Sequence, residues 1–250
     1  MTTSNIFCIW YPSGGFGHYI NAVLSVYGQG FVRPKNAPKF SNNGNSHSVD
    51  LVAPKYFHDP ESYQYDFDPK LNYSVLIDNG ITNEGIKFKK FFPEANIIKI
   101  CYSDFTWPVV ANTMIVKAMN QNIESELPVD STLWSSDEPW AQREKYFLFL
   151  RDHSLRNAWK PSTLAQTLMI DDLIDYNALH QNININLDNF ETFHHAWWNA
   201  NKQYFLPVLT ARKILQGQFE PVNDIWTQAV VYYQIWCKPF GDNQFFHLDL

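Results

Sequence analysis

The chain has 250 residues, of which 45% are hydrophobic, 16% aromatic and 18% charged, and its formal net charge at pH 7 is −6. A chain of this length and apolar content can bury a sizeable core, and we expect residues 1–250 to form a single domain. The modest acidic balance argues against a nucleic-acid-binding protein, because such proteins concentrate Lys and Arg on one face.

The N-terminal region predicts a strand, a glycine-rich turn and a helix. Residues 5–11, NIFCIWY, form a short apolar run that Pro12 closes, which favours a buried strand. The turn PSGGFGH follows it. Apolar side chains then recur at helical spacing, at Ile20, Val23, Leu24 and Tyr27.

Strands and helices continue to alternate as far as residue 122. Residues 34–70 are rich in Asn, Ser, Pro and Gly and predict a long loop, in which residues 50–57 could form a short strand or helix turn. Residues 73–78 and 96–102 predict a second and a third strand with a short helix between them, and residues 103–121 predict a further helix. This alternation predicts a parallel sheet with helices on its faces.

The second half of the chain is richer in helices. Residues 141–160, 186–205 and 219–237 predict helices, and residues 167–171, TLMID, predict one more strand. We therefore expect an α/β fold: a three-layer sandwich with a central, mostly parallel sheet and a helix-rich C-terminal half.

The glycine-rich turn is the strongest candidate for a binding site. Ligands of open α/β sheets bind outside the carboxyl ends of the strands, and the following helix offers its first N–H groups and its positive end to an anion. A tight turn without a ligand is the alternative interpretation. His18 could also serve as a general base. The residues that could cradle a phosphate are Ser13, Gly14, Gly15, Phe16, Gly17 and His18.

The order of strand, YPSGGFGH turn and helix resembles the start of the sulfotransferase family, which has a P-loop-type α/β fold. Tyr11, Pro12 and Gly15 match that family's Tyr-Pro-Lys-Ser-Gly-Thr-Thr turn, and Ser13 stands where the family has Lys. The resemblance implies a transferase that binds a nucleotide such as 3′-phosphoadenosine 5′-phosphosulfate (PAPS) or its bisphosphate product (PAP). It further implies sulfonate transfer to a hydroxyl-bearing small-molecule acceptor, without a metal.

Two later segments extend the resemblance. NIIKICYSDFTWPVVANTMIVKA is similar to the strand and helix that bind the donor's 3′-phosphate in that family, although the family's Arg is absent. The resemblance therefore implies that Ser103 and Thr113 contact the nucleotide. TLMIDDLID is similar to the family's strand that ends in Tyr-Glu-Asp-Leu, with Asp172 and Leu173 matching Asp-Leu.

Two other functions remain open. The missing Lys and Arg favour a catalytically inactive structural or interaction protein of the same fold, of the kind a viral genome could encode, with a protein assembly partner. The run GGFG also resembles the start of some fucosyltransferases and would imply a nucleotide-sugar glycosyltransferase. An enzyme needs the turn open toward a cationic pocket, whereas a structural protein would have it plugged, for example by Phe16 turned inward.

For the Cys, His and Asp residues outside the turn, the sequence predicts structural roles and no role in catalysis or metal binding. Cys8 and Cys101 lie in apolar runs and predict buried, unreactive thiols, and no zinc spacing is present. His194 and His195 are adjacent on a predicted helix and point apart, which disfavours a chelated metal. Asp171, Asp172 and Asp175 predict caps and turns. With neither a signal peptide nor a long apolar span, we expect a cytoplasmic protein with no membrane partner.

Overall fold

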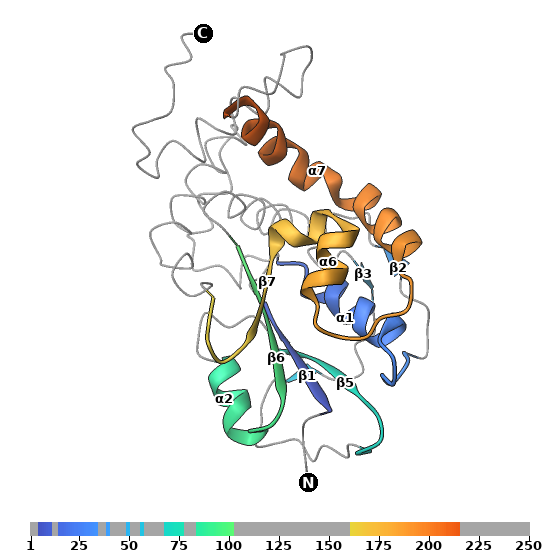
Figure 1. The fold of residues 1–250 in the computed structure, drawn as a ribbon, viewed down its shortest axis with the longest axis vertical. Coiled ribbons are helices and arrows are strands. Elements are labelled where there is room, and N and C mark those ends of the chain that lie inside the picture. The colour runs from blue at the N-terminus through green and yellow to red at the C-terminus, as the bar shows by residue number, and fades with distance from the viewer. Residues whose placement is uncertain are drawn as a thin grey trace, which may run out of the picture.

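The computed structural model describes residues 5–11, 15–34, 39–40, 49–50, 56–57, 68–77, 84–102 and 161–215. Its centre is a five-stranded sheet in the order β4-β5-β1-β6-β7, in which each pair of neighbours is parallel (Figure 1). These strands are β1 (Ile6–Trp10), β4 (Tyr56–Phe57), β5 (Tyr73–Ile77), β6 (Asn96–Cys101) and β7 (Gln166–Met169). The predicted parallel sheet and its four longer strands are confirmed, with small differences at their ends.

The helices of the described part are α1 (Gly17–Tyr27), α2 (Glu84–Phe91), the 3-10 helix η2 (Ile170–Ile174), α6 (Tyr176–Asn182) and α7 (Glu191–Leu215). The helix predicted at 186–205 is present as α7, and the short helices η2 and α6 were not predicted; the other described helices follow the predicted alternation. The two-residue strands β2 (Lys39–Phe40) and β3 (Val49–Asp50) pair with each other, antiparallel. The helices predicted at 103–121, 141–160 and 219–237 lie outside the described residues. None of the helices described is long and apolar enough to cross a membrane.

The two faces of the sheet meet different helices. Ser74 Oγ donates a hydrogen bond of 2.6 Å to Oδ1 of Asn21, which places α1 on the face that carries Ser74 and its register partner Phe7. Side chains alternate along a strand, so Cys8 and Trp10 lie on the opposite face. The connection from β1 to β5 and the connection from β5 to β6 run in opposite directions along the sheet, and right-handed crossovers then place α1 and α2 on opposite faces. The fold is therefore α/β, with helices on both faces of the sheet.

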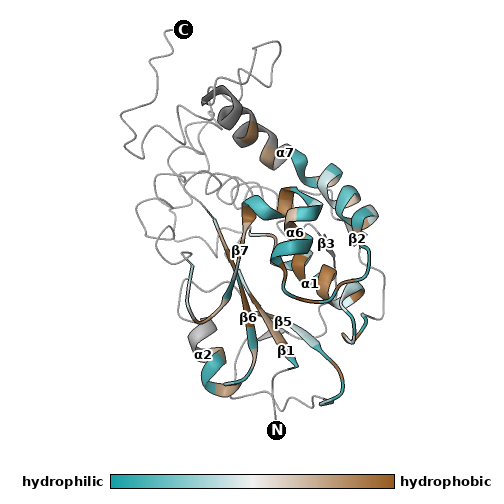
Figure 2. Cartoon of the chain, in the orientation of Figure 1, coloured by the Kyte–Doolittle hydropathy of each residue, from teal (hydrophilic) through white to brown (hydrophobic). Residues whose placement is uncertain are grey.

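Burial explains why the strands could be recognised in the sequence. A parallel sheet covered on both faces has strands that are apolar without alternation, and β1, β5 and β6 are buried over most of their length. The strands are accordingly among the most hydrophobic parts of the ribbon in Figure 2, while α6 and the first half of α7 carry polar faces. Cys8 and Cys101 are fully buried, as predicted.

Lys89 closes the end of α2. Its Nζ donates to the carbonyl oxygens of Pro93 at 3.0 Å and Ala95 at 2.6 Å, just beyond the helix. Carbonyl groups at a helix C-terminus lack partners within the helix, and a cationic donor there is favourable. Lys89 thus fixes the turn that feeds the chain into β6.

We expect Lys89→Met to lower the free energy of unfolding by about 1–2 kcal/mol, because it removes a charged donor from two carbonyl groups and keeps the apolar stem. Lys90→Met is the matched control at the neighbouring exposed position, where a change under about 0.5 kcal/mol is expected. Urea unfolding followed by circular dichroism measures both. Equal losses in the two variants would contradict the capping role.

Candidate functional site

The strand order diverges between β1 and β6. From β1 the chain continues to β5 on one side, whereas β6 is followed by β7 on the other side. Ligands of open α/β sheets bind where neighbouring strands diverge in this way, outside their carboxyl ends. This rule predicts a ligand position, which we call the crevice, between the carboxyl ends of β1 and β6, and α1 is the helix that follows β1.

The start of α1 is buried and lacks a side-chain cap. Phe16 is the N-cap residue, its side chain makes no capping hydrogen bond, and the first turn contains no acidic residue. The Phe16 carbonyl accepts hydrogen bonds from the amides of Tyr19 at 3.0 Å and Ile20 at 3.3 Å. The first N–H groups of a helix have no partner within it and carry its positive end. An anion in the crevice would accept hydrogen bonds from these N–H groups and would be attracted to the positive end of the helix.

Phe16 shapes this turn through an unusual backbone conformation. Its φ of 60° and ψ of 26° are left-handed, which costs a non-glycine residue about 1–2 kcal/mol. Its ring is buried against α7, with ring centroids 5.5 Å from Trp197 and 5.1 Å from Phe205. Burial of an aromatic ring gains more than this strain costs. The side chain therefore points away from the crevice, and only the Phe16 backbone could serve an anion.

Gly17 and His18 complete the described part of the turn. A Cβ at Gly17 would overlap the aromatic ring of Tyr11, so this position requires glycine. His18 is 4% exposed, and its ring meets the Tyr11 ring edge-on at a centroid distance of 6.1 Å. Tyr11 thus packs against both residues and holds the end of β1 to the first turn of α1.

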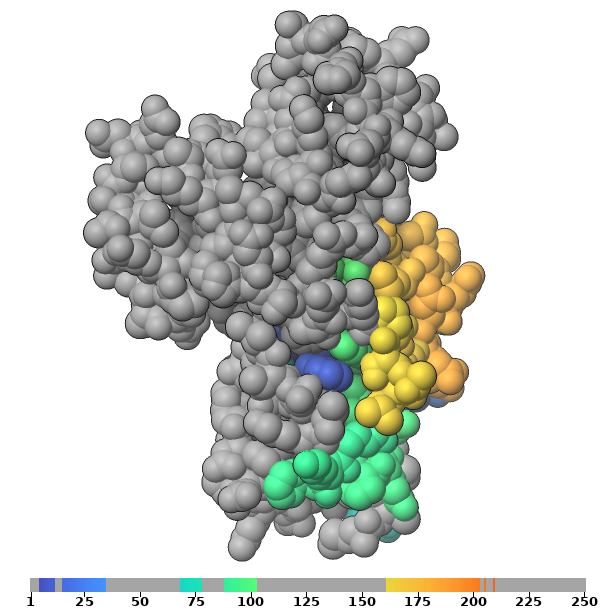
Figure 3. Space-filling view, turned by 90° about the vertical axis from the view of Figure 1, so that its left-hand side faces the viewer, coloured from blue at the N-terminus to red at the C-terminus, as the bar shows by residue number. Residues whose placement is uncertain are grey.

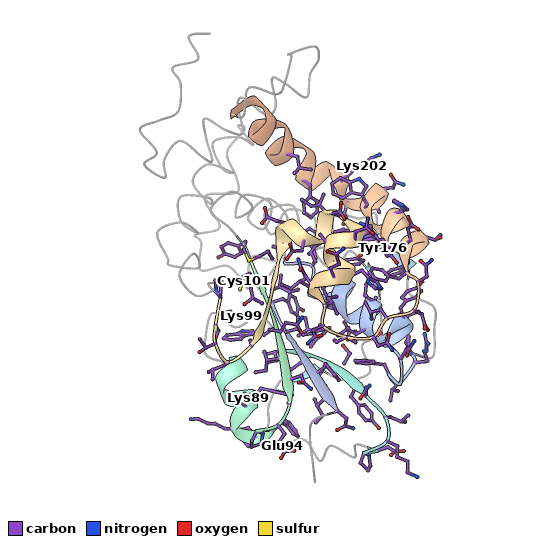
Figure 4. The ribbon with its side chains drawn as sticks, in the orientation of Figure 1. Lys89, Glu94, Lys99, Cys101, Tyr176 and Lys202 are labelled. Atoms are coloured by element: carbon purple, nitrogen blue, oxygen red, sulfur yellow. The ribbon has the colours of Figure 1, made fainter. Side chains whose placement is uncertain are left out.

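Lys99 is a buried cation near the carboxyl end of β6. It is aligned with Trp10 across β1 and β6 and is only 4% exposed. Its Nζ lies 4.3 Å from the Trp10 ring centroid, a cation–π contact. Burial lowers the pKa of the Lys99 side chain, and Cys101 has a smaller, opposite effect. Figure 4 shows Lys99 and Cys101 in the carboxyl half of β6.

Cys101 is a poor nucleophile in this setting. Burial raises the pKa of its thiol to about 11, although the charge of Lys99 acts in the opposite direction. The thiol therefore stays protonated at neutral pH, and a thiol is a far weaker nucleophile than a thiolate.

On the side of the molecule seen in Figure 3, atoms of the β1 segment lie next to atoms of β6 and β7.

The structure brings some of the predicted site residues together. Gly15, Phe16, Gly17 and His18 are all buried at the start of α1. Ser13, Gly14, Ser103 and Thr113 lie outside the described residues. Lys99 was missed in the sequence analysis, although a lysine inside the apolar run NIIKICY was the signal that could have identified it.

Polar residues elsewhere have structural partners. Asp175 Oδ1 accepts hydrogen bonds from the amides of Asn177 and Ala178, and Asp172 Oδ2 accepts one from the amide of Met169, which confirms their predicted capping roles. His195 is exposed and lies 3.6 Å from Glu191. Across the described residues, no group of three or more His, Cys, Asp and Glu side chains is arranged to hold a metal ion.

Comparison of the chain with protein-family models, with curated proteins and with solved structures finds no match.

We expect Phe16→Ala to lower the free energy of unfolding by about 3–5 kcal/mol, because it leaves a cavity between α1 and α7. Phe91→Ala is the matched control on α2, where the ring is 44% exposed and the change should be under about 1 kcal/mol. Chemical unfolding measures both variants. A Phe16→Ala loss as small as that of the control would mean that the ring does not anchor the turn.

Proposed function

We propose that this chain binds a phosphate- or sulfonate-bearing small molecule in the crevice between β1 and β6. One observation carries the proposal: the uncapped, buried start of α1 lies at the point where the strand order diverges. A helix N-terminus alone is common, but here it coincides with the ligand-binding position of open α/β sheets.

The positive charge of Lys99 also supports the proposal, because it would attract an anion. Lys99 is aligned with the last residue of β1, close to the carboxyl ends of the strands, and its side chain lies with Trp10 on the face of the sheet opposite α1. The family that the turn resembles has its lysine within the turn, at the position of Ser13. A lysine from the neighbouring strand offers an anion a positive charge from a different direction.

The ligand class that we propose is a nucleotide-type anion such as PAP or PAPS, in a P-loop-type fold resembling that of sulfotransferases. Within this proposal, sulfonate transfer to a hydroxyl would need a base, and His18 is the turn residue that could serve. Its burial beside Tyr11 means that the acceptor hydroxyl would have to reach the first turn of α1.

A second candidate function is a structural or interaction protein of the same fold. Its supporting observation is the inward Phe16 ring, which joins the turn to the aromatic core of α7. This is the arrangement expected for a turn that packs rather than binds. The two candidates differ in a measurable way, because only the first requires an anion to stabilise the protein.

Thermal unfolding with PAP, GDP or sulfate tests the binding proposal. A ligand at about 100 times its dissociation constant stabilises a protein by about 2.7 kcal/mol, which is several degrees for a chain of this size. We expect PAP to raise the melting temperature and Gly15→Asp to abolish the increase, because a carboxylate there would repel the anion. A shift with GDP alone would favour a nucleotide-sugar enzyme. No shift with any of the three would leave the structural candidate.

A variant of Lys99 separates a role in binding from a role in stability. Lys99→Met replaces a buried ammonium with an apolar side chain of similar length, so we expect a melting temperature close to that of the wild type. We expect affinity for PAP to fall about ten- to hundredfold, the loss typical of one charge-assisted hydrogen bond. Isothermal titration calorimetry measures the affinity, with Lys90→Met as the control. A destabilised variant with unchanged affinity would assign Lys99 to the fold instead.

A further inference from the structure

His194 joins three elements near the start of α1. On α7, its Nδ1 lies 2.7 Å from the hydroxyl of Tyr19, and its Nε2 lies 3.4 Å from the carbonyl oxygen of Ile174 in η2. A carbonyl oxygen only accepts, so Nε2 carries the proton and Nδ1 accepts from Tyr19. The neutral imidazole is therefore the form that fits this site.

Tyr19 connects this histidine to the proposed binding turn. It lies in the first turn of α1, where its amide donates to the Phe16 carbonyl. Its ring is fully buried and stacks on Trp197, with ring centroids 4.0 Å apart and planes 15° from parallel. The Phe16 ring also contacts Trp197, in an edge-on arrangement. The start of α1 is thus held to α7 by Phe16 and by the Tyr19–His194 pair.

The groups that surround His194 do not favour its charged form. Burial lowers the pKa of His194; the hydrogen bond to Ile174 raises it, the nearby His195 lowers it and Asp175 raises it. Asp175 already accepts two amide hydrogen bonds as the N-cap of α6, and Glu191 pairs with His195 on α7. Among the described residues, the phenols of Tyr19 on α1 and Tyr176 on α6 also lie against the His194 ring.

We propose that His194 is a pH-sensitive latch, which holds the first turn of α1 against α7 and η2 while neutral and releases it when protonated. An imidazolium would carry a second N–H that faces the Tyr19 hydroxyl, so this hydroxyl would have to turn from donor to acceptor. It would also place a charge among buried aromatic rings. Loosening this contact would disturb the backbone that Phe16 presents to the crevice. The effect on anion affinity rests on the proposed function, whereas the latch itself does not.

The direction of the pH effect follows from the lowered pKa. An unfolded or released histidine titrates near 6.5, and the latched one titrates lower. Between these two values the released state binds a proton that the latched state does not. The latch therefore contributes its full stability above about pH 6.5 and loses it as the pH falls toward the pKa of the latched form.

Amide hydrogen exchange without ligand tests the latch between pH 7.5 and 5. The reporters are the amides of Tyr19 and Ile20, which donate to the Phe16 carbonyl. In the wild type we expect their protection, corrected for intrinsic exchange, to fall up to tenfold per pH unit below about 6.5. His194→Gln should show a protection that no longer varies with pH, and the exposed His195→Gln should match the wild type. A wild type without pH dependence, or a His194→Gln variant that keeps it, would overturn the proposal.

A direct titration covers the case in which His194→Gln does not fold. We expect the C2 proton of His194 to report a pKa below 6.5 by NMR in the wild type, with His195→Gln used to separate the two signals. In Tyr19→Phe, which keeps the ring and loses the donor to Nδ1, this pKa should rise toward 6.5. A wild-type value of 6.5 or more would refute the latch. Absence of any anion binding would refute only the proposed function.

Discussion

The left-handed backbone of Phe16 is the constraint on which the candidate site depends. This conformation turns the chain from β1 into α1 and directs the Phe16 ring into the aromatic core of α7. The ring of Tyr11 then lies where a Cβ of residue 17 would be, so the next residue must be glycine. The orientation of the first N–H groups of α1 is therefore fixed by aromatic packing from both sides, without a capping side chain.

The sequence predicted the parts of the fold that local patterns determine. The strands of a sheet buried on both faces are continuous apolar runs, so β1 and β6 were found within one or two residues, and the helical period identified α1, although not its exact ends. The Tyr19–His194 hydrogen bond joins residues 175 positions apart, and the cation–π contact of Lys99 with Trp10 depends on strand register. Neither of these two contacts produces a pattern within one segment of the sequence, so neither contact could be predicted.

The resemblance to sulfotransferases concerns the order of strands and helices more than the residues of the turn. At the level of fold, a buried parallel sheet with a glycine turn into α1 is what the resemblance implies, and many unrelated functions share such sheets. At the level of residues, the turn has Phe16 where the family has a threonine, and the Phe16 side chain is inside the core. At this position only backbone groups are left for an anion, and these suit binding of an anion better than its activation.

Two buried ionisable groups set opposite demands on pH at the proposed site. Burial lowers the pKa of both Lys99 and His194. An anion in the crevice would favour protonated Lys99, so the loss of its proton sets the upper limit of binding. The Tyr19 contact favours neutral His194, and its protonation sets the lower limit. Binding would then be strongest between the two pKa values, because the group that supplies charge and the group that holds the backbone are both in their required forms only there.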